Sequence, residues 1–172
     1  ADESFSVGRN FYALRSRTDF GNKTLGYMLT HVDDSFNDSK ATVNVIDYVN
    51  VKSDQLTYFT DLLFSEKDDD SRFGYRSQFN YQPSNFSYIS GSILYFDENF
   101  QLNDFGYLRR ADWIHVGLGG GLKQINFSKE SPIDQIDMNV DFNYDADTNG
   151  NSNPIRIDQK NEITFKNTSK LK

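Results

Sequence analysis

Apolar and polar residues alternate one by one along much of this chain. In one clear segment Phe73, Phe79 and other apolar residues stand at odd-numbered positions, while Arg76 and Gln78 stand at the even-numbered positions between them. The segment 136–144 alternates just as strictly. Because successive side chains of a β-strand point to opposite faces, each segment has one apolar and one polar face. The pattern therefore predicts strands, and helical spacing fits none of these segments.

The alternating segments are unusually long for a soluble protein. Nine of them are predicted, near 10–20, 24–32, 41–51, 55–64, 72–82, 86–96, 113–125, 135–144 and 155–167. Each covers about nine to thirteen residues, whereas an ordinary soluble strand has about five or six. A tilted strand that crosses a bilayer needs about nine to eleven residues. The length of the segments favours membrane-spanning strands.

The predicted connections alternate in length along the chain. Short turns are expected at 21–23, 52–54 and 83–85, long loops at 33–40, 65–71, 97–112 and 145–154, and a medium loop at 126–134. Short turns at one end and long loops at the other are typical of outer-membrane barrels. We therefore expect an all-β fold: an antiparallel up-and-down outer-membrane β-barrel, or a contiguous part of a larger one, with residues 1–172 as a single region of about nine strands.

Composition narrows the class further. Aromatic residues make up 15% of the chain and hydrophobic residues only 37%, so the chain is expected to fold although it contains no apolar run long enough for a membrane-spanning helix. Cysteine is absent, which excludes disulfides and thiolate metal sites. The net charge of −7 argues against nucleic-acid binding, which requires a basic surface.

Part of the chain resembles a known family. The relevant residues are the stretch from Phe100 to Trp113, with its centre Asp104-Phe105-Gly106-Tyr107-Leu108-Arg109-Arg110, and the opening Asn10-Phe11-Tyr12-Ala13-Leu14-Arg15, followed by Asp19-Phe20-Gly21-Asn22 and Leu25-Gly26. They resemble an uncharacterised bacterial family in which a large outer-membrane barrel follows a family-9-type carbohydrate-binding domain. The resemblance implies location in the bacterial outer membrane and a porin-like barrel, and no catalytic residues come with it.

The odd number of predicted strands suggests a fragment, since single-chain bacterial barrels have an even number. The expected partners are therefore outer-membrane lipid and the remaining strands of a larger barrel, from this chain or another, with carbohydrate as a further candidate. In that case the first and last strands do not pair with each other.

The polar faces carry charges of both signs, which a membrane barrel must turn inward. A charge on the lipid side at mid-bilayer costs roughly 2–4 kcal/mol. The residues expected to face the lumen are Arg15, Arg17, Arg76, Gln78, Lys123, Asp137, Asn139, Asp141, Asp158 and Glu162. Those expected to face lipid include Phe73, Tyr75, Phe79, Tyr81, Met138, Val140 and Phe142.

One predicted loop contains a residue pattern that is typical of a calcium-binding site. Asp145, Asp147 and Asn149, followed by Gly150, match the first half of a calcium loop, in which oxygens at alternate positions wrap the ion. The twelfth position is Arg156 rather than the bidentate Glu of an EF-hand. A polar hairpin loop explains the same residue types. No cofactor is otherwise expected, so Ca²⁺ at these three residues is the one candidate.

Catalysis finds little support. The two histidines, His31 and His115, lie far apart in the sequence, and no Gly-x-Ser-x-Gly motif is present. The glycines of 117–121 lie in a strand, where inward glycines mark a bend or a place where something fills the lumen. The expected function is a non-catalytic outer-membrane barrel with a polar lumen, serving passage of solutes or anchoring of a carbohydrate-binding domain. The alternatives are a soluble extracellular all-β module that binds glycans, and a barrel enzyme acting through loop or lumen carboxylates.

Overall fold

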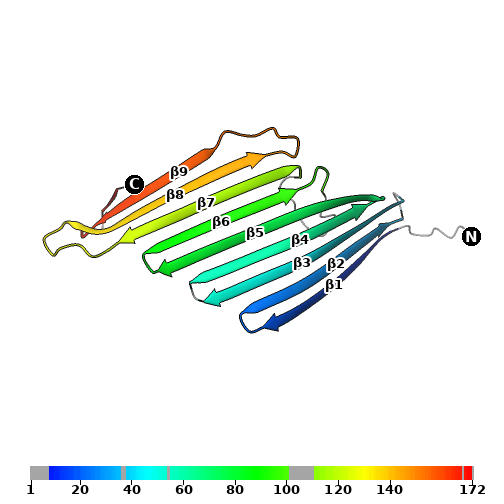
Figure 1. Ribbon diagram of the computed structural model, residues 1–172, viewed down its shortest axis with the longest axis horizontal. Helices are drawn as coiled ribbons and strands as arrows, with labels where there is room; N and C mark the ends of the chain where they lie inside the picture. Colours follow the sequence, from blue (N-terminus) through cyan, green and yellow to red (C-terminus); the bar gives the residue numbers. More distant parts are fainter. Residues whose placement is uncertain (1–7, 36–37, 54, 101–110, 168, 172) are drawn as a thin grey trace, which may run out of the picture.

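The computed structural model describes residues 8–35, 38–53, 55–100, 111–167 and 169–171. Their regular structure forms one antiparallel up-and-down sheet, in which each strand pairs with the next along the chain (Figure 1). The strands are β1 (Arg9–Phe20), β2 (Lys23–Asp34), β3 (Ser39–Ser53), β4 (Leu56–Lys67), β5 (Asp70–Ser84), β6 (Ser87–Phe96), β7 (Trp113–Gln124), β8 (Ile133–Ala146), β9 (Arg156–Phe165) and β10 (Lys170–Leu171).

The nine predicted strands correspond to β1–β9, which confirms the all-β, up-and-down prediction. They are between 10 and 15 residues long, so the unusual length is also confirmed. The sequence pattern missed β10, because its two residues are too few to show an alternation.

The strands extend into two predicted long loops. β2 ends at Asp34 and β3 begins at Ser39, within the predicted loop 33–40, and the predicted loop 65–71 contracts to Asp68 and Asp69. The turn at Asp68 and Asp69 is possible because both aspartates adopt positive φ, at 48° and 67°, as a two-residue type I′ turn requires. The flanking charged residues extend the strands instead of forming loops, so the predicted contrast between the two ends of the sheet is weaker than expected.

The sheet is open rather than closed into a barrel (Figure 1). Among the described residues, β1 pairs with β2 alone, and β9 pairs with β8 and β10. Leu14 is therefore opposite Leu29 of β2, and Ile163 is opposite Ile136 of β8 and Leu171 of β10. The prediction that the first and last strands do not pair with each other agrees with this arrangement.

The pairing register divides the side chains into two faces. We call one the polar face; it carries Arg15, Asp61, Arg76, Asp141 and Asp158. The opposite, apolar face is illustrated by one row of directly paired positions, which runs from Tyr58 through Phe79, Gly91, Leu118 and Phe142 to Ile157.

A small core lies on the polar face, near the connection between β6 and β7. Leu63, Phe96 and Phe100 are buried there, with Phe100 only 2% exposed, and Val45, Leu94, Ala111 and Trp113 pack around them. Gly74 makes room for this cluster: a Cβ at that position would lie 2.8 Å from the ring of Phe96 and 3.3 Å from that of Phe100.

Asp97 fixes the chain where it leaves β6. One carboxylate oxygen accepts a hydrogen bond from the backbone N–H of Phe73 at 2.7 Å, and the other accepts from the hydroxyl of Tyr95 at 2.6 Å. These bonds direct the next residues toward the polar face, where Phe100 packs. The Asp104–Arg110 segment, which carries the family resemblance, lies outside the described residues.

Candidate functional site: the polar face and its glycine-lined groove

The ten residues predicted to face a lumen all lie on the polar face. Asp61 is opposite Arg76 in the register, and Lys123, Asp137 and Glu162 form one continuous row across β7, β8 and β9. Following the register through every strand pair places the remaining predicted residues on the same side. The seven residues predicted to face lipid all lie on the apolar face.

The apolar face is almost free of charge. On β1–β9 the register assigns to it four residues among Lys, Arg, Asp and Glu, namely Lys23, Asp33, Lys40 and Glu66. Each is the first or second residue from an end of its strand. The middle of this face is therefore apolar or neutral, although large side chains such as Leu118 and Ile157 are 53% and 60% exposed.

A row of four charges crosses the polar face. Arg15 forms an ion pair with Asp47, and Arg76 forms one with Asp61. Asp47 and Asp61 are directly opposite each other on β3 and β4, a like-charge arrangement that is unfavourable by itself. The two arginines offset this repulsion from either side. Gly26 of β2 lies under the Arg15–Asp47 pair, where a Cβ would collide with the Asp47 carboxylate.

A second feature, the glycine furrow, follows β7. Gly117, Gly119 and Gly121 occupy successive positions of the polar face, opposite Ser92, Ser90 and Tyr88 of β6. On the other side they are opposite Asn143, Asp141 and Asn139 of β8. The three glycines make room for side chains of the neighbouring strands: a Cβ would collide with Oδ1 of Asp141 at Gly119, and with the ring of Tyr88 at Gly121.

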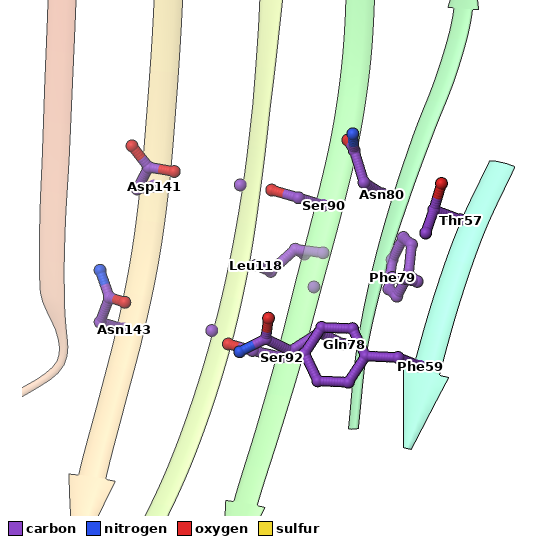
Figure 2. Close-up of a pocket in the computed structure, with 13 residues that line it drawn as sticks. Thr57, Phe59, Gln78, Phe79, Asn80, Ser90, Ser92, Leu118, Asp141 and Asn143 are labelled. Carbon is purple, nitrogen blue, oxygen red and sulfur yellow. The ribbon is translucent and has the colours of Figure 1, made fainter. Parts of the chain in front are cut away.

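The furrow widens into a groove of about 350 Å³ over β4–β8. Figure 2 shows Asp141 and Asn143 along one side, Ser90 and Ser92 in the middle, and Gln78 with Phe59 on the other side. The floor is low because Gly117 and Gly119 contribute no side chain there. The guanidinium carbon of Arg76 lies over the ring of Phe59, 5.4 Å from the centroid of that ring.

The groove concentrates hydrogen-bonding groups that the protein leaves unused. Several polar groups elsewhere on this face are paired: the Tyr88 hydroxyl donates to Asn139 at 3.1 Å, and Arg156 donates to Asp158 at 2.7 Å. Within the described part of the chain, seven polar side chains of the groove have no such partner. These groove side chains are Thr57, Gln78, Asn80, Ser90, Ser92, Asp141 and Asn143.

The sequence pattern identified only part of this groove. Alternation predicts Gln78, Asp141 and Asn143 on the polar sides of their strands, whereas the strand of Ser92 has no charged residue that would mark its polar side. The register shows that Ser92 and Asn143 lie next to Gly117. Phe59 is an apolar residue at a polar-face position of β4, where it lines the groove.

A hydrogen-bonded cluster closes the end of the furrow beyond Gly117. Oδ1 of Asp145 accepts a hydrogen bond from Nε1 of Trp113 at 2.8 Å and lies 2.9 Å from Nδ1 of His115. The other ring nitrogen of His115 points toward the furrow, since it lies 3.1 Å from where a Cβ of Gly117 would be. Asp145 thus orients both rings at this end of the polar face.

The calcium candidate residues do not converge on one point. The carboxylate of Asp145 contacts the rings of Trp113 and His115. The carboxylate of Asp147 instead bonds to backbone groups of its own loop. Oδ1 of Asp147 accepts from the backbone N–H groups of Asn149 and Asn151 at 3.0 and 2.8 Å. Both carboxylates are therefore occupied by N–H donors that an ion would have to displace.

We predict that Asp145, Asp147 and Asn149 bind Ca²⁺ no more tightly than the weakest calcium modules, with a Kd of about 1 mM or above. The reason is the competition from those N–H donors. Calorimetric titration of the wild type and of Asp147→Ala measures this. A micromolar Kd that Asp147→Ala abolishes would contradict the prediction.

The described ranges contain no helix long and apolar enough to span a membrane. In the same part of the chain, no group of three or more His, Cys, Asp and Glu residues is placed to hold a metal ion. Comparison of the chain with family models, curated proteins and solved structures gave no match.

Proposed function

We propose that this chain forms part of the wall of a bacterial outer-membrane β-barrel, with its polar face toward a water-filled lumen and its apolar face toward lipid. One observation carries the proposal: every charge that the register assigns to the middle of β1–β9 lies on one face, while the other face is charged only near the strand ends. Burying a single mid-bilayer charge against lipid costs roughly 2–4 kcal/mol, so a membrane wall requires such a distribution.

The dimensions of the sheet support the same conclusion. A transmembrane strand needs about nine to eleven residues and an outward apolar band about 25 Å tall. On the apolar face, β4 carries no charge from Leu56 to Ser65, and β8 carries none from Ile136 to Ala146. A soluble glycan-binding sandwich would need a second sheet over this face, and the described residues form one sheet.

The edges of the sheet support a larger assembly. In lipid, unpaired backbone N–H and C=O groups are not tolerated. β1 forms one edge of the described sheet, and at the other edge only the two residues of β10 cover part of β9. Further strands, from this protein or from another chain, therefore cover β1 and the rest of β9 in the proposed barrel.

In this proposal the barrel is non-catalytic, and its role is passage of solutes or anchoring of an attached carbohydrate-binding domain. The polar face supports passage in particular, since it combines paired charges with a groove of neutral polar groups. The anchoring role rests on the family resemblance alone.

Spin labels test the assignment of the two faces. Because the chain contains no cysteine, a single Cys at Phe79 or Phe142 reports on the apolar face, and one at Gln78 or Asn139 on the polar face. In lipid vesicles we expect the first pair to be relaxed mainly by lipid-soluble oxygen and the second pair by a water-soluble nickel chelate. Equal access of the nickel chelate to both pairs would rule out the membrane proposal.

A further inference from the structure

We propose that the groove over the glycine furrow is a binding site for a neutral carbohydrate, with Phe59 as an aromatic platform and the groove side chains as hydrogen-bond partners of the sugar hydroxyls. This inference rests on the proposed function, since it requires the polar face to be the water-filled side of the sheet.

The unused hydrogen-bonding capacity of the groove is the first argument. The seven groove side chains lie within one trough and have no protein partner in the described part of the chain. Six of them are amides or hydroxyls, which can both donate and accept hydrogen bonds. Sugar hydroxyls have the same dual character, so a neutral polyhydroxylated ligand can satisfy many of these groups together.

Charge is the second argument, and it selects among polar ligands. The one charged side chain among the seven is Asp141, which is directly opposite Asp158 of β9. Asp158 is already paired with Arg156, so Asp141 is the groove carboxylate that would repel a phosphate or carboxylate ligand. The arginines beside the groove, Arg76 and Arg156, are both held by aspartates. A carboxylate does accept strong hydrogen bonds from neutral hydroxyl groups. The groove therefore favours uncharged sugars over anionic ones.

Shape is the third argument. The groove volume of about 350 Å³ lies at the lower end of the range for small-ligand sites, about 300–1,000 Å³. The groove crosses the strands from β4 to β8, which is four strand spacings of about 4.8 Å. An open trough of this length accommodates a short linear oligosaccharide better than a compact molecule.

Phe59 supplies the apolar contact that the polar groups lack. It is a large aromatic ring on the polar face of β4, opposite Gln78, and Figure 2 shows the ring beside the Gln78 side chain. The C–H groups on one side of a pyranose ring can pack on Phe59, while the further sugar residues of an oligosaccharide that lies across the strands reach Asp141 or Asn143 on β8. Aromatic side chains of this kind contribute much of the binding energy where a ligand is partly apolar.

The test is calorimetric titration of the full chain, folded in a detergent without a sugar headgroup, with maltotriose, cellotriose and trigalacturonate. We expect at least one neutral trisaccharide to bind with a Kd of about 1 mM or below, and trigalacturonate to bind at least about tenfold more weakly. Phe59→Leu and Asn143→Ala should each weaken binding of the neutral sugar by about tenfold or more.

Two further variants keep the result interpretable. Phe59→Tyr preserves the aromatic platform and should retain binding, while Phe64→Leu changes a phenylalanine on the apolar face of the same strand and should leave the Kd unchanged. No binding of either neutral sugar at about 10 mM, or binding that Phe59→Leu and Asn143→Ala leave intact, would overturn the inference. The spin-label experiment measures the surroundings of the two faces without any sugar. Failure of the sugar site is therefore distinguishable from failure of the membrane proposal.

Discussion

Phe142→Arg is expected to impair folding into lipid vesicles severely, whereas Asp141→Arg, one residue earlier on β8, is expected to be tolerated. Phe142 lies on the apolar face, 44% exposed, in the middle of a strand with no charge on that side. An arginine there must enter hydrocarbon, at a cost of roughly 2–4 kcal/mol at the midplane. An arginine in place of Asp141 faces Asp158 across the strand pair and replaces a like-charge contact with an attractive one.

Folding in urea-containing lipid vesicles, followed by tryptophan fluorescence and by the heat-dependent gel mobility of folded barrels, measures both variants. Each variant introduces one arginine at an adjacent position of the same strand, so neither the introduced residue nor its place along the chain can explain a difference between them. Similar stabilities for the two variants would show that the two faces have the same surroundings, and the barrel proposal would then be untenable.

Arg76→Met is expected to destabilise the protein by about 2–3 kcal/mol, and more than Asp61→Asn does. The reason is the unequal exposure of the pair: the side chain of Asp61 is 9% exposed and that of Arg76 is 48% exposed. Removing the arginine leaves a nearly buried carboxylate directly opposite Asp47. Removing the charge of Asp61 leaves an arginine that still reaches water and relieves the repulsion from Asp47.

Urea unfolding of both single variants and of the double variant gives the coupling between the two residues. The double variant should be more stable than the sum of the single effects predicts, because it removes both the unpaired carboxylate and its partner. Methionine retains an unbranched apolar chain near Phe59, so lost packing stays small. Arg17→Met, at the exposed Arg17–Asp19 pair, is the control and should not move the unfolding midpoint. A larger effect for Asp61→Asn than for Arg76→Met would refute this explanation.

The strands were predictable because their signal is local. Alternation along β5 and β8 assigns Arg76, Gln78, Asp137 and Asp141 to one side and Phe79 to the other, and the register agrees at each of these positions. Phe59 and Leu63 of β4 depart from this pattern, since both are apolar residues at polar-face positions. The structure explains both, since Phe59 lines the groove and Leu63 belongs to the small core of Phe96 and Phe100.

The strand ends were less predictable, because charge at the end of a strand resembles charge in a loop. Glu66 and Lys67 were assigned to a loop, yet they pair with Ser71 and Asp70 across a two-residue turn. The choice depends on whether Asp68 and Asp69 adopt positive φ. Aspartate tolerates that conformation without requiring it, so composition alone does not distinguish the turn from a longer loop.

The sequence by itself determined which face of its strand each residue occupies, because that depends only on the two-residue period of an extended chain. It thereby separated the charged positions from the apolar ones. Only the tertiary structure decided which residues on different strands are neighbours: that Gly26 lies beneath the Arg15–Asp47 pair, and that Gly119 separates Ser90 from Asp141. Register depends on turn geometry and on contacts between strands, and a shift of two residues would preserve every face while dispersing both the charge row and the groove.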